Sequence, residues 1–242
     1  MSPGAGAART RTQVLASSLG QTLITVGLVL LLFCVYELWV TGLHTAREQS
    51  GLGDELERSW ALPEPAAAVV PAKTGQRAAP RDLPALGSAL ARIHAPRLGA
   101  RWSWVVVEGV GPQDLQKGPG HYPGTALPGE VGNTVVSGHR TTYGAPFNDL
   151  LELQEADAVV LETQRSWVTY RVTARSIVPP SAVEVTLPVP GRPGAEPTER
   201  LLTLTTCHPE YSARERLVVH AQQESVLAKA PGVRPSALDE RP

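Results

Sequence analysis

The chain has 242 residues, with 22 Lys or Arg against 23 Asp or Glu, so its formal net charge is −1. Such a near-neutral chain lacks the broad basic surface that binds phosphates, and we expect no nucleic-acid partner. The two cysteines, Cys34 and Cys207, argue against a disulfide framework, because Cys34 lies within an apolar run. The length suits one domain with appendages.

The first predicted element is an apolar run at residues 22–41, which contains one charged residue, Glu37. A helix of about 20 residues spans a hydrocarbon core of about 30 Å, so the run is predicted to be a transmembrane helix. A cleaved signal peptide is the alternative. No A-x-A-like cleavage site follows the run, and Trp39 is typical of an interfacial anchor, so the sequence favours an uncleaved signal anchor.

Charge on the two sides of this run predicts its orientation. Residues 1–21 carry Arg9 and Arg11 but no acidic residue, whereas acidic residues follow the run. Basic flanks stay in the cytoplasm, which predicts a cytoplasmic tail at 1–21 and an extracellular position for the bulk of the chain. We therefore expect a single-pass protein of the plasma membrane.

Two segments have a composition that predicts little packing. Residues 42–87 are rich in Ala and Pro, and are predicted to form an extended extracellular linker. Residues 225–242 have a similar composition and are predicted to form a flexible tail. Residues 88–224 between them are predicted to form the folded domain.

The sequence pattern of that domain is typical of an all-β protein, because short apolar or alternating runs are separated by Gly and Pro turns. Eight runs are predicted to be strands: 89–93, 104–109, 134–139, 158–163, 168–173, 176–178, 201–206 and 216–221. Their spacing favours an antiparallel barrel or sandwich, with short helices near 112–116 and 146–153.

Cys207 is the first candidate for chemistry. It stands where the apolar run 201–206 gives way to the polar residues His208 and Glu210. A thiol at a strand end is accessible and suits a nucleophile, although free cysteines are also often buried in cores.

His139 and Arg216 are the candidates to assist it. His139 follows Gly138 at the end of a predicted strand, and Arg216 opens the last predicted strand. A histidine can act as acid and base, and a guanidinium can stabilise an oxyanion, so with Cys207 they would form an acyl-transfer site. A structural histidine and a solvated arginine are the alternatives. Arg214 competes with Arg216, because strand alternation can place both on one face.

A metal centre is not indicated. The sequence contains no C-x-x-C or H-x-x-x-H spacing, and no glycine-rich phosphate loop follows a predicted strand. We expect no metal and no cofactor.

Four stretches resemble a known family: GPGHY at 118–122, LPGEVGN at 127–133, GHRTTYGAPF at 138–147 and TLTTCHPEYSARERLVV at 203–219. The segment TLTTC matches the T-L-x-T-C signature of sortases, and the finer match is to the class E sortases of actinobacteria. The resemblance spans about residues 88–223. It implies an eight-stranded sortase-type β-barrel with short helices, preceded by a membrane anchor.

The resemblance also implies an activity and roles. Sortases are cysteine transpeptidases that cleave a sorting signal between Thr and Gly, LPxTG in general and LAxTG in class E. They hold the threonyl group as a thioester. By resemblance Cys207 is the nucleophile, His139 the acid–base residue, and Arg216 the catalytic arginine because it opens the final R-L-V-V strand. Tyr143 and Thr206 are expected to bind substrate.

The implied partners are secreted proteins with an LAxTG- or LPxTG-like signal, the amine of the peptidoglycan precursor lipid II, and the membrane. A membrane-anchored cysteine endopeptidase and a pilus-polymerising sortase are the alternatives. The latter often carries an Asp-Pro-aromatic lid motif, which residues 42–100 lack. A non-enzymatic binding module is disfavoured because all three candidate catalytic residues are present.

Overall fold

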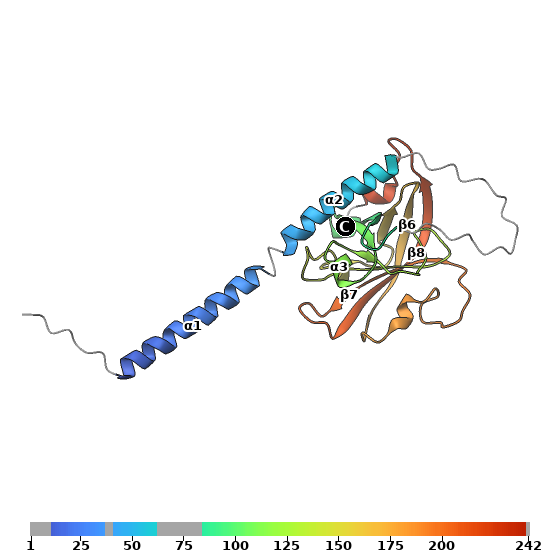
Figure 1. Cartoon of the computed structure of the whole chain (residues 1–242). Helices are drawn as coiled ribbons and strands as arrows, with labels where there is room; N and C mark the ends of the chain where they lie inside the picture. Colours follow the sequence, from blue (N-terminus) through green and yellow to red (C-terminus); the bar gives the residue numbers. More distant parts are fainter. Residues whose placement is uncertain (1–10, 37–40, 62–83, 241–242) are drawn as a thin grey trace, which may run out of the picture. The chain divides into compact units, whose positions relative to one another are not determined.

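The structure is a computed structural model that describes residues 11–36, 41–61 and 84–240 (Figure 1). The chain divides between Val40 and Thr41 into two compact units. The first unit contains helix α1 (Arg11–Val35). Within the described ranges one helix, Leu15–Val35, is long and apolar enough to cross a membrane. The predicted span 22–41 agrees with it as far as Val35, whereas Glu37 and Trp39 lie outside the described residues.

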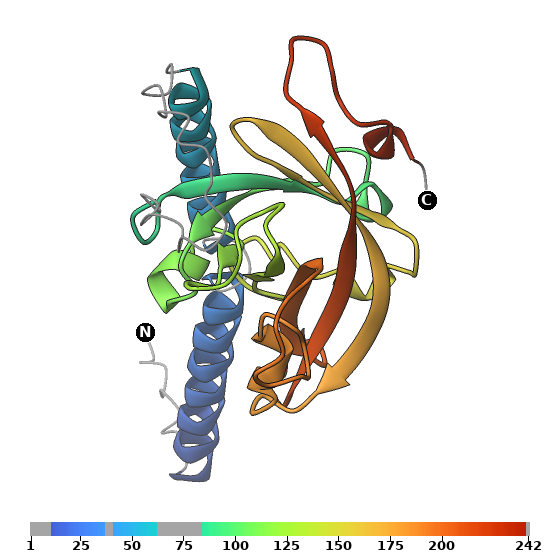
Figure 2. The ribbon, with the colours of Figure 1, turned by 90° about the vertical axis from the view of Figure 1, so that its right-hand side faces the viewer.

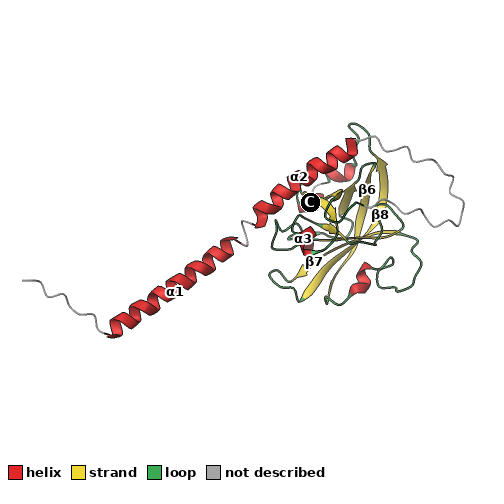
Figure 3. Ribbon diagram, in the orientation of Figure 1, coloured by secondary structure: helices red, strands yellow, loops and turns green. Residues whose placement is uncertain are grey.

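The second unit is built mainly of strands, drawn in yellow in Figure 3. They form a closed barrel with the strand order β1-β2-β3-β4-β7-β8-β6-β5. The strands are β1 (Ala89–His94), β2 (Ser103–Glu108), β3 (Gly120–His121), β4 (Gly132–Ser137), β5 (Ala158–Glu162), β6 (Ser166–Val178), β7 (Arg200–His208) and β8 (Glu215–Ala228). The predicted eight-stranded β-barrel is confirmed. The expectation of a purely antiparallel barrel is wrong, since β2 pairs with β3, and β4 with β7, in parallel.

Two strand predictions differ from the structure. The runs 168–173 and 176–178 belong to one long strand, β6, which pairs with β8 along its length (Figure 2). The pairing register shifts between Val172 and Ala174, and such a bulge interrupts the alternation on which the prediction depended. Strand β3 was not predicted, because two residues are too few to show a period.

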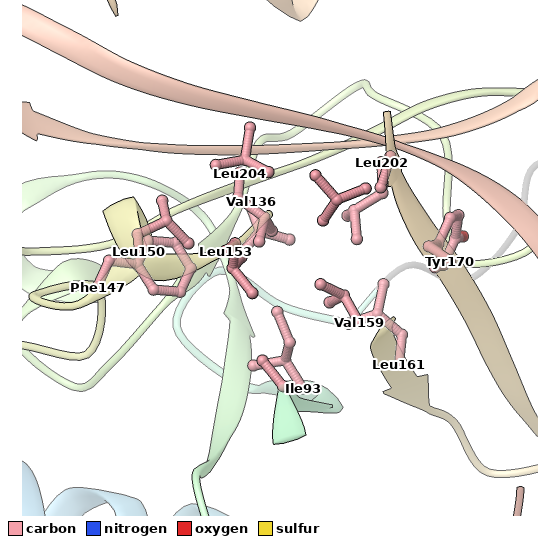
Figure 4. Close-up of a cluster of buried hydrophobic side chains, with 14 of the residues drawn as sticks. Ile93, Val136, Phe147, Leu150, Leu153, Val159, Leu161, Tyr170, Leu202 and Leu204 are labelled. Carbon is pink, nitrogen blue, oxygen red and sulfur yellow. The ribbon is translucent and has the colours of Figure 1, made fainter. Parts of the chain in front are cut away.

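The barrel interior is filled by apolar side chains that alternate along the strands (Figure 4). Leu202 and Leu204 of β7 point into this core, as do Leu217 and Val219 of β8. The predicted short helices are present as α3 (Pro112–Leu115) and the 3-10 helix η3 (Leu150–Glu152). Each is one turn long, and the second adds buried leucine to the core.

The predicted linker at 42–87 is wrong for residues 42–61. They belong to helix α2 (Thr41–Ala61), which packs on β1 and β2. Its Leu52 and Leu56 are buried against Val105 and Val107 of β2. The Pro-rich composition that suggested a linker begins only after this helix, and residues 62–83 lie outside the described part of the chain.

Polar contacts also hold α2 on the barrel. Gln49 accepts a hydrogen bond from the Val105 N–H at 2.7 Å, and its amide donates to the Val105 and Lys117 carbonyls at 3.0 and 2.9 Å. Thr45 donates to the Gln116 carbonyl at 2.7 Å. Thr45, Gln49 and the two buried leucines recur at spacings of three and four residues, so one helix face makes all these contacts.

The predicted flexible tail at 225–242 is wrong over its described residues. Strand β8 runs on to Ala228, because it pairs with β6 as far as Ser166. Beyond it, Ala237 of the 3-10 helix η5 (Ser236–Asp239) is buried against β5. Glu240 forms a two-fold salt bridge with Arg171. The tail is therefore packed on the barrel.

Candidate active site

The three candidate catalytic residues come from the ends of three neighbouring strands. Cys207 of β7 is paired directly with Arg216 of β8 in the antiparallel register. On the other side of β7, Ser137 of β4 is paired in parallel with Thr205. His139 and Cys207 each stand two residues beyond this last pair. The barrel thus brings together residues that are far apart in the sequence.

Hydrogen bonds hold the end of β4 against the end of β7. The Gly138 N–H donates to the Thr205 carbonyl at 3.1 Å, and the Thr206 hydroxyl donates to the Gly138 carbonyl at 2.8 Å. The Arg140 guanidinium donates to the Cys207 carbonyl at 3.4 Å. Because these bonds flank the histidine on both sides, they fix its segment beside the strand that carries the thiol.

Thr206 is part of this framework. Its side chain is only 3% exposed, and it shares the inner face of β7 with Leu204. Its hydroxyl proton is already donated to the Gly138 carbonyl. The side chain therefore points into the barrel and away from the thiol, and the substrate-binding role of Thr206 stays a prediction.

Gly138 allows this framework to close tightly. A Cβ atom at this position would lie 2.8–3.1 Å from the ring of Phe147. The Phe147 N–H donates to the His139 carbonyl at 3.0 Å, and its ring is fully buried. The glycine therefore admits a core side chain directly beneath the segment that carries the histidine.

Tyr143 packs its ring on His139, with the ring centroids 5.0 Å apart and an interplanar angle of 40°. Its φ of 51° is left-handed, as are those of Gly144 (73°) and Ala145 (47°). A side chain at Gly144 would collide with Trp104, since its Cβ would lie 2.9 Å from that ring. Such conformations persist only where the surroundings enforce them and often occur at functional sites. The tight turn places Tyr143 beside the candidate acid–base residue.

Burial lowers the pKa of His139 below its usual value of 6.5, so the imidazole is neutral at pH 7. We expect an NMR titration of His139 to have its midpoint below 6.5, and the shift to shrink in Tyr143→Ala, which uncovers the ring. Because the folded chain then binds fewer protons, this site's contribution to stability is complete above pH ~6.5 and is lost as pH falls through the lowered pKa. A midpoint at or above 6.5 in the unmodified protein would contradict this.

Arg216 is held by the turn between β7 and β8. One guanidinium nitrogen donates to the carbonyls of Ala213 and Glu215 at 3.0 and 2.9 Å. The competing Arg214 is exposed and precedes the strand, where it has no cross-strand pairing with Cys207. The register therefore favours Arg216 over Arg214 as the arginine beside the thiol.

Arg216 also lines a groove of about 190 Å³ on the outer face of the barrel. One wall is made by β4, β7 and β8, with Ser137 and Thr205 beside the arginine, and the opposite wall by the β6–β7 loop (residues 179–199). The loop contributes mostly proline, alanine and valine side chains to this wall. The groove is suited to an extended peptide with small apolar side chains.

The sequence reading missed Arg140, which is only 8% exposed. Besides the Cys207 carbonyl, it donates to Nδ1 of His208 at 2.8 Å. A guanidinium only donates, so His208 must accept through Nδ1 and carry its proton on Nε2. The Arg140 carbonyl accepts from the Asn148 amide at 2.9 Å. Adjacency to the histidine was the only sequence signal for this role.

Among residues 11–36, 41–61 and 84–240, no group of three or more His, Cys, Asp or Glu side chains is arranged to hold a metal ion. The three candidate side chains offer a thiol, an imidazole and a guanidinium. A family model described as "Sortase domain" matches residues 93–224, which include all three. The chain belongs to the sortase family.

Relatives of this sortase include class E enzymes, which agrees with the resemblance found in the sequence. Sortase SrtE1 of Streptomyces coelicolor is 32% identical over 235 residues, covering 93% of this chain and 61% of that protein. This chain therefore spans less than two thirds of that relative. The structure of sortase E from Streptomyces avermitilis is 43% identical, with a TM-score of 0.58, and covers 64% of this chain and 99% of that one.

One solved structure among these relatives carries a ligand. The crystal structure of sortase E1 from Streptomyces coelicolor contains a tripeptide in its active site. It is 33% identical to this sortase, with a TM-score of 0.58, and covers 63% of this chain and 97% of that one.

Proposed function

We propose that this sortase is a membrane-anchored cysteine transpeptidase. It cleaves a C-terminal LAxTG- or LPxTG-type sorting signal between Thr and Gly, and transfers the protein to an amine of the peptidoglycan precursor lipid II. The observation that carries the proposal is the position of Cys207, His139 and Arg216 at the ends of three neighbouring strands of a sortase-family barrel, with Arg216 lining a groove that has one mostly apolar wall.

The first half of the reaction forms a thioester. His139 first accepts the proton of the Cys207 thiol, which leaves a thiolate beside a protonated imidazole. The thiolate attacks the threonyl carbonyl, and the carbonyl oxygen gains negative charge that the Arg216 guanidinium stabilises. The C–N bond to glycine then breaks, and His139 in its protonated form supplies the proton that the leaving amine needs. The threonyl group remains on sulfur, and the glycine-containing fragment departs.

The second half transfers the threonyl group. His139, now neutral, accepts a proton from the incoming amine as that amine attacks the thioester. The C–S bond breaks, a new amide forms and the thiolate is regenerated. Water in place of the amine would give hydrolysis, so the acceptor decides between a transpeptidase and an endopeptidase.

The helix Leu15–Val35 is proposed to be the membrane anchor. The N-terminal arginines favour a cytoplasmic N-terminus, which puts the barrel on the extracellular side, where the substrates are exported and the cell-wall precursor is presented. LAxTG is the preferred signal in this proposal. The support is the class E resemblance, with Tyr143 packed beside the acid–base residue as the proposed recognition residue.

The test uses the full chain in detergent with LAxTG and LPxTG peptides, with and without a glycyl peptide as amine, followed by mass spectrometry. We expect cleavage after Thr, ligation to the added amine, faster reaction of LAxTG, and no product from Cys207→Ala. Hydrolysis that the amine does not divert would instead indicate an endopeptidase. Cleavage by Cys207→Ala, or no cleavage of either peptide, would contradict the proposal.

A further inference from the structure

The β6–β7 loop needs an anchor that apolar packing does not supply. It connects its strands over residues 179–199, six of which are proline, and its one regular element is the 3-10 helix η4 (Val183–Thr186). Most of its side chains are exposed. Loops longer than about 12–15 residues without much secondary structure are uncommon and usually functional. This loop forms one wall of the groove beside Arg216.

Asn133 of β4 supplies that anchor. Its side-chain amide nitrogen donates to the backbone carbonyls of Val185 and Leu187, both at 3.1 Å. Asn133 is only 1% exposed, so these bonds are shielded from water. The two acceptors stand on either side of Thr186, which lines the groove. Both amide protons of Asn133 are thus donated to carbonyls of the loop.

A hydrogen-bond relay fixes the orientation of this amide. The Thr203 hydroxyl donates to Oδ1 of Asn133 at 2.8 Å, and Nδ1 of His220 lies 3.0 Å from the same hydroxyl oxygen. Since the hydroxyl proton is used toward the asparagine, the histidine must donate through Nδ1–H. Burial lowers the pKa of His220, which keeps this ring neutral at pH 7. If the Asn133 amide were flipped, its oxygen would face the carbonyl oxygens of Val185 and Leu187 and repel them. Only one orientation of the amide therefore forms all three hydrogen bonds.

The relay stands on the same strands that hold the chemistry. Thr203 and Cys207 share the outer face of β7, because they are four residues apart on a strand. Asn133 and Ser137 share the outer face of β4 in the same way. Through Asn133 and Thr203 the loop is therefore attached to β4 and β7, the two strands whose ends carry the proposed nucleophile and acid–base residue.

From this geometry we infer that Asn133 is a positioning residue that holds the β6–β7 loop over the groove, and so sets how tightly the sorting signal binds. Thr203 and His220 orient its amide. The inference rests on the proposed function for its substrate, the sorting-signal peptide, but not for the attachment of the loop. Asn133 contacts neither the thiol nor the bond that breaks, so its effect falls on binding.

The direct test is Asn133→Asp in the full chain. The carboxylate has the same shape but cannot donate, and it repels the two carbonyls that the amide holds. We expect KM for the LAxTG peptide to rise about tenfold or more, with a smaller change in kcat, as loss of buried hydrogen bonds predicts. Alkylation of Cys207 by iodoacetamide should change less than about twofold, because a small reagent needs no groove.

Hydrogen exchange measures the loop itself. Peptides that cover 179–199 should exchange faster in Asn133→Asp, and those that cover β1 and β2 should not. Gln113→Glu is the matched control: it makes the same amide-to-carboxylate change at an exposed residue of α3, outside the loop and its groove, and should alter neither exchange nor KM. Unchanged loop exchange in Asn133→Asp would overturn the inference.

A second pair of variants keeps the test decisive if Asn133→Asp does not fold. Thr203→Ser retains the hydroxyl and should resemble the unmodified protein, whereas Thr203→Val removes it and should raise both KM and loop exchange. Equal behaviour of the two would refute the relay. If loop exchange responds but no peptide is cleaved by the unmodified chain, the proposed function fails and the anchor stands. If peptides are cleaved while KM and exchange do not move, the anchor alone fails.

Discussion

Replacing Arg216 with alanine is expected to lower kcat/KM for peptide ligation by about 10²–10³, the usual loss when one oxyanion donor is removed. Arg216 is paired across the strands with Cys207 and brings a guanidinium to the end of the groove. The thiol does not depend on it for access, so Cys207 should still be alkylated. Rates of ligation and of alkylation, both followed by mass spectrometry, separate these two effects.

Two variants sharpen this prediction. Arg214→Ala is the matched control, because that side chain is exposed and precedes β8, and it should keep nearly full activity. Arg216→Lys keeps the charge but loses the planar fork, so an intermediate rate is expected if geometry contributes besides charge. If Arg214→Ala were inactive and Arg216→Ala active, the two arginines would exchange roles. Full activity in both alanine variants would show that neither Arg214 nor Arg216 takes part in the reaction.

Removing the apolar face of α2 is expected to destabilise the barrel unit strongly. Leu52 and Leu56 are 5% and 1% exposed and pack on β2. Truncating a buried leucine to alanine costs about 2–5 kcal/mol, and whole domains are stable by only about 5–15 kcal/mol. The double variant Leu52→Ala, Leu56→Ala should therefore unfold at much lower urea concentration than the unmodified chain.

Urea unfolding of the full chain in detergent, followed by tryptophan fluorescence, measures this effect. Leu43→Ala is the control on the same helix, since Leu43 is 59% exposed and should cost little. If the double variant and the control unfolded at the same urea concentration, α2 would not belong to the cooperative unit. The same result would restore the extended-linker interpretation of residues 42–61.

Much of this protein could be predicted from local patterns. Strand alternation and Gly/Pro turns indicated the barrel, and the motif around Cys207 indicated the family, because both signals lie within a few consecutive residues. The apolar span was visible for the same reason. His139 and Arg216 were found through their own short motifs. The register pairs Arg216 with Cys207, and it ends β4 two residues before His139, alongside the strand that carries the thiol.

Other features depend on contacts between distant positions. Alternate residues of a strand face opposite sides, and the sequence alone does not show which residues of β7 face inward. A shift of one residue would have placed Thr206 on the outer face, whereas in the structure it faces the core. Helix α2 looked like the start of a linker because its apolar face is sparse, and only β2 shows what covers it.

By itself, therefore, the sequence determined the all-β class, the apolar span, the sortase family and the three residues proposed for catalysis. Only the tertiary structure decided that Arg140 is buried against the strand of the thiol, and that Asn133 holds a loop more than fifty residues away in the chain. The physical reason is that hydrogen bonds and burial act over a few ångströms in space. The residues next to Asn133 or Arg140 in the sequence do not indicate which distant carbonyl will accept its hydrogen bond.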